Sequence, residues 1–156
     1  MTQKTWITLA AGGSAALLLG AFAFQHLGGL APCKMCIWQR YPHAVAIALG
    51  AIAFFVPLPV LLTLGALAAL TTAAVGAYHV GVEQRWWEGP SSCSGGSIDT
   101  LDPNALFDQI MAAPLVRCDE IAWQLAGLSM AGWNMVISLV LAAFWIAALR
   151  ARPTSA

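Results

Sequence analysis

The sequence predicts an all-α membrane protein: a bundle of four transmembrane helices with a short interfacial helix in the second extracytoplasmic loop. Of its 156 residues, 60% are hydrophobic and only 9% are charged, whereas soluble domains average about 25% charged residues. Lys, Arg, Asp and Glu are absent from three long segments, 6–30, 41–82 and 121–149. Prolines 57 and 59 divide the middle segment into two. We therefore expect a single membrane domain over residues 1–156.

The segments predict the four spans in order, because a helix needs about 20 apolar residues to cross about 30 Å of hydrocarbon. The first span is expected at about 6–27. A cleaved signal peptide is the alternative there, although the apolar core is long for one. Since proline breaks helices, the middle segment predicts spans at about 41–57 and 59–82, joined by a very tight turn. The last span is expected at about 126–149.

Small and aromatic residues predict how the spans pack and where they meet the membrane surface. Small side chains allow helices to approach closely, and we expect this role for Gly12, Gly13, Ala15, Ala16, Gly65, Ala68, Ala69 and Thr72. Trp133 and Trp145, near the ends of the last span, are expected in the interfacial aromatic belt.

An even number of spans places both termini on one side and the two longer loops, 28–40 and 83–120, on the other. All four cysteines lie in these loops and therefore face one compartment. Basic residues are more concentrated in the short terminal segments than in the long loops, which favours cytoplasmic termini. An oxidising compartment outside the cytoplasm suits paired cysteines. Net charge is zero, so nothing indicates a nucleic-acid partner.

The second loop contains one segment that predicts a helix and another that predicts an exposed, mobile chain. Asp102 can cap a helix whose first position is Pro103, and apolar residues follow at four-residue spacing up to Pro114. This segment predicts a helix in the membrane interface; a loop helix that packs on the protein is the alternative. Cys93 stands in GPSSCSGGS, a composition that predicts an exposed, mobile segment.

The cysteine spacing allows three kinds of site. Cys33 and Cys36 form a C-x-x-C pair, whereas Cys93 and Cys118 are far apart in the chain. A structural zinc site would show two close pairs. Two structural disulfides are possible, but a four-residue ring constrains little unfolded-state entropy. A C-x-x-C pair is more useful as a redox couple, because it can open and close without rearranging the fold.

Residues near the first pair favour redox chemistry. Cys36 is expected at the start of the second helix, where unpaired N–H groups and a nearby cation lower a thiol's pKa. Arg40 follows four residues later, on the same helix face. The alternative for Arg40 is that it only extends to the membrane surface.

The combination of C-K-M-C, the following I-W-Q-R, four spans and a distant cysteine pair in the next loop resembles the bacterial disulfide bond formation protein B (DsbB) family. The resemblance covers essentially the whole chain. It implies an inner-membrane oxidoreductase with cytoplasmic termini and periplasmic redox loops. Such an enzyme reoxidises a thioredoxin-fold dithiol oxidase (DsbA type) and passes the electrons to membrane quinone, ubiquinone or menaquinone. The chain shows no fused oxidase domain, so we expect the partner to be a separate protein.

The resemblance also implies a role for each cysteine. Cys93 would form the mixed disulfide with the partner, and Cys118 would be its mate. Freed Cys118 would attack Cys33 and leave Cys36 as a thiolate, which contacts the quinone ring. Each of these positions matches the family motif in this sequence.

Two further residues match the family's quinone site. Arg40 matches the arginine that supports quinone binding. His79, at the end of the third span, matches by position a histidine near the quinone, although a structural histidine is the alternative. His26 and His43 have no such match and are expected to be packing or interface residues.

Two other functions stay open. A membrane enzyme resembling the quinone epoxide reductases also uses a C-x-x-C in a helix bundle. A membrane scaffold or transport subunit with structural disulfides would need neither Arg40 nor a reactive Cys36.

Overall fold

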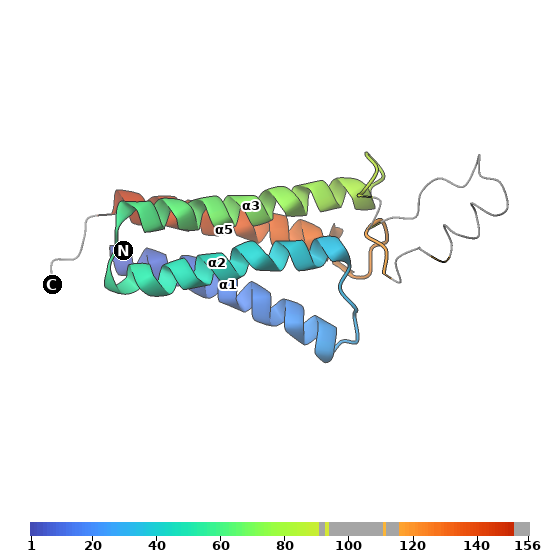
Figure 1. The fold of residues 1–156 in the computed structure, drawn as a ribbon, viewed down its shortest axis with the longest axis horizontal. Coiled ribbons are helices and arrows are strands. Elements are labelled where there is room, and N and C mark those ends of the chain that lie inside the picture. The colour runs from blue at the N-terminus through green and yellow to red at the C-terminus, as the bar shows by residue number, and fades with distance from the viewer. Residues whose placement is uncertain (91–92, 94–110, 112–115, 152–156) are drawn as a thin grey trace.

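The computed structural model describes residues 1–90, 93, 111 and 116–151. Four long helices run side by side along its longest axis (Figure 1). They are α1 (Gln3–His26), α2 (Lys34–Phe55), α3 (Pro59–Glu83) and α5 (Met130–Arg150). The start of α1, the α2–α3 connection and the end of α5 share one end of the bundle (Figure 1). The interfacial helix predicted over 102–114 falls, apart from Met111, outside the described residues.

Three helices among the described residues are long and apolar enough to cross a membrane: α1, α3 and α5. The sequence prediction of four long helices is confirmed, and so is its membrane character in these three. Helix α2 is not among them; it begins at Lys34 and carries Gln39, Arg40 and Pro42. A fourth membrane span over α2 therefore stays a prediction.

The tight turn between the second and third helices is confirmed. Helix α2 ends at Phe55 and α3 begins at Pro59. Proline suits the first position of a helix, because the N–H that it lacks would have no partner inside the helix there. Residues 56–58 make the whole connection.

The second helix begins earlier than the span predicted from residue 41. Cys33 has an extended backbone and its sulfur accepts a hydrogen bond from Cys36 N at 3.3 Å, which caps the helix and lets it start at Lys34. Cys36 and Arg40 consequently belong to the helix rather than to a loop over 28–40. The expectation that Cys36 stands at the start of this helix is confirmed.

The last helix begins later than expected because a small hairpin precedes it. Strand β1 (Gln124–Leu125) pairs with antiparallel β2 (Leu128–Ser129). Ala126 and Gly127, between them, both have positive φ, 51° and 80°, as in the two-residue turns that suit hairpins. Ser129 then caps α5 by accepting a hydrogen bond from Gly132 N at 3.1 Å. The sequence pattern had not predicted this hairpin.

Trp145 lies in the core, so its predicted place in the interfacial belt is wrong. Its side chain is fully buried with apolar residues of the other helices, including Ile7 and Leu62. A Cβ atom on Gly65 would lie only 2.6–2.7 Å from atoms of the indole ring. The predicted close approach at Gly65 is thus confirmed, because α3 leaves the space that the Trp145 ring occupies.

Candidate redox site

The four cysteines come together at the end of the bundle that carries the longer connections. Cys33, Cys93 and Cys118 are buried in one cluster with Met35 and Val82, and Cys36 packs against it. Cys118 N donates a hydrogen bond to Cys93 O at 2.8 Å. The predicted exposure of Cys93 is wrong for its side chain, because the apolar cluster covers the sulfur.

The C-x-x-C pair is held with its sulfurs in contact. All four cysteines are free thiols, and the Cys33 thiol donates to Cys36 Sγ at 2.9 Å. A disulfide is about 2.05 Å long, so a small movement closes this ring. The hydrogen bond to Cys36 and burial raise the pKa of Cys33. Burial and a hydrogen bond with Cys118 raise the pKa of Cys93 to about 12.

The second pair lies within reach of the first. Ligand atoms of Cys33, Cys118 and His79 all lie within 4.8 Å of one another. Thiolates and imidazoles bind zinc, but a structural zinc site takes four protein ligands, whereas this group offers three among the described residues. Thiol–disulfide exchange needs one sulfur to attack another directly, which the closeness of Cys33 and Cys118 allows.

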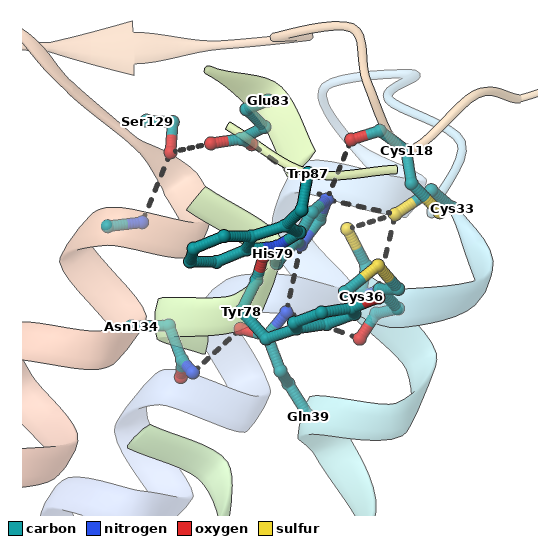
Figure 2. A network of polar contacts seen from close by, with 12 residues as sticks. Cys33, Cys36, Gln39, Tyr78, His79, Glu83, Trp87, Cys118, Ser129 and Asn134 are labelled. Carbon is teal, nitrogen blue, oxygen red and sulfur yellow. Dashed lines mark hydrogen bonds and ion pairs between the residues drawn. The ribbon is translucent and has the colours of Figure 1, made fainter. Parts of the chain in front are cut away.

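His79 points into the sulfur cluster (Figure 2). Its Nε2 atom lies 3.6 Å from Cys33 Sγ, 3.2 Å from Cys118 O and 3.9 Å from Glu83 Oε1. On the other side of the ring, Nδ1 lies 3.0 Å from Gln39 Nε2. Ser129 Oγ donates to the Glu83 carboxylate, which is itself almost fully buried.

A hydrogen-bond network behind His79 was not predicted from the sequence. Asn134 on α5 donates to Gln39 Oε1 at 2.7 Å and to Thr72 Oγ1 at 3.1 Å. Its Oδ1 lies 2.9 Å from His43 Nε2. Polar side chains in otherwise apolar helices tend to bond across helices, so the amides Gln39 and Asn134 were the available signal. His43 was expected to be a packing or interface residue, and it also takes part in this network through Asn134.

Arg40 reaches from α2 to α1. Its Nη1 atom donates to Gln25 Oε1 at 2.6 Å and its Nη2 atom donates to Ala21 O at 3.4 Å. The guanidinium carbon lies 5.0 Å from the centre of the Phe22 ring, a cation–π distance. Arg40 Nε is buried and has no hydrogen-bond partner among the described residues.

A cavity of about 510 Å³ lies between α1, α2 and α5. Its walls are mainly apolar, and its few polar groups come from Cys36, Gln39, Arg40, His43 and Asn134. A smaller cavity shares Cys36 and Arg40 with it and is also lined by Cys33, His79 and Glu83. The predicted site residues therefore divide between two adjoining spaces: Cys36 and Arg40 line both, whereas His79 lines only the smaller.

Comparisons with known proteins agree over almost the full chain. The family model described as disulfide bond formation protein DsbB matches residues 3–148. A disulfide bond formation protein B of Pasteurella multocida is 32% identical over 88% of this chain and 83% of that protein. The protein of the same name from Verminephrobacter eiseniae is 34% identical over 95% of this chain and 86% of its own length. A third, from Methylococcus capsulatus, is 34% identical over 83% and 84%.

Proposed function

Because the chain belongs to the disulfide bond formation protein B family of membrane proteins, we propose that it is a protein-dithiol:quinone oxidoreductase. It reoxidises a thioredoxin-fold dithiol oxidase of the DsbA type and delivers the electrons to ubiquinone or menaquinone. One observation carries the proposal: four cysteines converge beside an apolar cavity, and Cys36 belongs to both the cluster and the cavity wall.

The sulfur positions suggest the order of exchange. A partner thiolate attacks Cys93 of a Cys93–Cys118 disulfide and releases Cys118 as a thiolate. Cys118 then attacks Cys33, which forms a Cys33–Cys118 bond and leaves Cys36 as a thiolate. The short separation of Cys33 and Cys118 supports this step. While that bond exists, Cys118 cannot reverse the first exchange, so the partner's second thiol resolves the mixed disulfide and leaves as part of the partner's own disulfide.

The larger cavity fits a quinone head group, which is flat, apolar and carries two carbonyl oxygens. Small-molecule sites typically combine apolar walls with a few convergent polar groups, and its volume of about 510 Å³ is of the usual size. Bound quinone would supply a two-electron acceptor. Cys93 would attack Cys118, which re-forms the Cys93–Cys118 disulfide and releases the Cys33 thiolate. Cys33 would then bond to Cys36 at the cavity wall as the two electrons pass to the acceptor, which would take up two protons, one of them lost by Cys93. The Arg40 guanidinium would offset negative charge that develops there. His79 reaches this site only from the smaller cavity.

The protein is proposed to lie in the bacterial inner membrane with both termini in the cytoplasm and the cysteines in the periplasm. The cysteine cluster contains Met35 at the start of α2 and Val82 at the end of α3. These two helix ends lie at the opposite end of the bundle from the start of α1 and the end of α5 (Figure 1). The oxidising periplasm is where such thiol chemistry operates. Helix α2 is proposed as the fourth span, with its polar groups turned to the other helices.

The direct test is anaerobic quinone reduction by the purified protein in detergent, with a reduced DsbA-type oxidase as donor. We expect wild-type turnover with a ubiquinone or menaquinone analogue and none with Cys36→Ser. Ser138→Ala, a buried change at a residue that lines neither cavity, is the matched control and should retain turnover. A folded wild-type protein that reduces neither quinone would contradict the proposal and favour structural disulfides.

A further inference from the structure

We propose that His79 is a positioning residue: its ring carries the proton on Nε2 and uses it to hold Cys118 against Cys33. This inference deepens the proposed function, because it names what brings the two sulfurs together for exchange. It differs from the role predicted for His79 at the quinone. Three steps through the network in Figure 2 lead to it.

The first step orients Asn134. Its Nδ2 atom lies 3.4 Å from Thr72 O, and a carbonyl oxygen can only accept a hydrogen bond. The amide nitrogen of Asn134 therefore faces this side, and its oxygen faces His43. The Gln39 atom 2.7 Å from Asn134 Nδ2 must in turn be an acceptor, which makes it Oε1.

The second step places the proton of His79. With Oε1 facing Asn134, the amide nitrogen of Gln39 faces Met35 O at 3.2 Å and His79 Nδ1 at 3.0 Å. An amide nitrogen only donates, so Nδ1 accepts and carries no proton. A neutral imidazole has one N–H, which must then be on Nε2. Hydrogen-bond networks assign histidine tautomers in this way.

The third step follows that proton to the sulfurs. The protonated Nε2 atom lies 3.2 Å from Cys118 O, 3.6 Å from Cys33 Sγ and 3.9 Å from Glu83 Oε1. Its strongest bond is to the Cys118 carbonyl, so it ties the segment around Cys118 to α3. Gln39 ties the same ring to α2, the helix that Cys33 caps. One side chain thereby links the two segments whose sulfurs must meet.

The same geometry excludes a simpler role for His79. A base that takes the Cys118 proton needs a free lone pair on Nε2, but that atom carries the proton and Nδ1 is bonded to Gln39. The ionisable groups around the ring are Cys118, which lies within 4.8 Å of it, and those that line the smaller cavity with it: Cys33, Cys36, Arg40, Glu83, Arg117 and Glu120. The larger cavity is not lined by His79.

The test needs neither quinone nor the protein partner. In a Cys36→Ser, Cys93→Ser background only Cys33 and Cys118 remain, and the fraction joined as a disulfide is measured by mass spectrometry in glutathione redox buffers. His79→Gln keeps an N–H near the Nε2 position, whereas His79→Asn ends near Nδ1 and leaves the Cys118 carbonyl unbonded. We expect His79→Asn to lower the equilibrium constant about tenfold, as the loss of one buried hydrogen bond would, and His79→Gln to stay within about twofold.

Equal equilibrium constants for the Cys33–Cys118 disulfide in wild type and His79→Asn would overturn the proposal. An equal decrease of this constant in His79→Asn and His79→Gln would overturn it too, because the imidazole ring itself, and not its N–H group, would then be required. Should His79→Asn fail to fold, ¹⁵N NMR of histidine-labelled wild type still decides: a proton on Nδ1 refutes the assignment. Failure of the proposed function would appear separately, as absent quinone turnover by a protein whose Cys33–Cys118 equilibrium still depends on His79.

Discussion

Replacing Asn134 with leucine tests the network that joins α5 to α2 and, through Gln39, to His79. The change keeps the side chain's approximate size and removes the bonds to Gln39 Oε1 at 2.7 Å, Thr72 Oγ1 at 3.1 Å and His43 Nε2 at 2.9 Å. Hydrogen bonds between membrane helices average about 0.6 kcal/mol and reach about 1.7 kcal/mol. Three of them predict a loss of about 2–5 kcal/mol in the free energy of unfolding.

The assay is reversible unfolding of the purified protein in mixed micelles with a rising fraction of sodium dodecyl sulfate, followed by circular dichroism. Ser138→Ala is the matched control. Ser138 lies one turn further along α5, is fully buried, and its hydroxyl has no hydrogen-bond partner among the described residues. Removing an unpaired buried hydroxyl should be neutral or slightly stabilising.

The result that refutes this reasoning is an unfolding free energy for Asn134→Leu equal to that of Ser138→Ala. The amides would then contribute nothing to the bundle. The orientation of Gln39, and with it the proton position on His79, would lose its physical basis.

Gly65→Ala should lower the free energy of unfolding by about 1–3 kcal/mol, because the added methyl group overpacks against Trp145. Gly12 has open space at its Cβ, so Gly12→Ala should raise the free energy of unfolding by up to about 1 kcal/mol. Equal effects of the two changes in the sodium dodecyl sulfate titration would contradict the packing at Gly65. In the fully reduced protein, alkylation of Cys93 should keep accelerating from pH 9 towards pH 12, because its pKa is raised to about 12. The contribution of the buried, neutral Cys93 thiol to the free energy of unfolding is complete below pH 9 and is lost as the pH rises from 9 to 12. An alkylation rate that levels off at pH 9 would contradict the raised pKa of Cys93. Arg40→Met should lower quinone turnover by about 100-fold, and an unchanged rate would limit Arg40 to joining α1 and α2.

The sequence alone determined the four long helices and the closeness of the first cysteine pair, because both depend on residues close together in the chain. Apolar length and the absence of charge predict a long helix wherever they occur, and Pro57 and Pro59 act on their own backbone. The C-x-x-C spacing places Cys33 and Cys36 in one helical turn whatever the rest of the chain does. These are local properties, and the structure has four long helices and the Cys33 cap.

Only the tertiary structure decided which distant groups meet. Tryptophan near the end of a span is typical of the membrane interface, yet Trp145 is buried, because Gly65 on α3 has no side chain and leaves space for the indole ring. His79 lies beside Cys33 and Cys118, and Asn134 bonds Gln39, because helix rotation and packing bring those faces together. A hydrogen bond also has a direction, which spacing along a chain does not encode; the proton position on His79 follows from partners on three different helices.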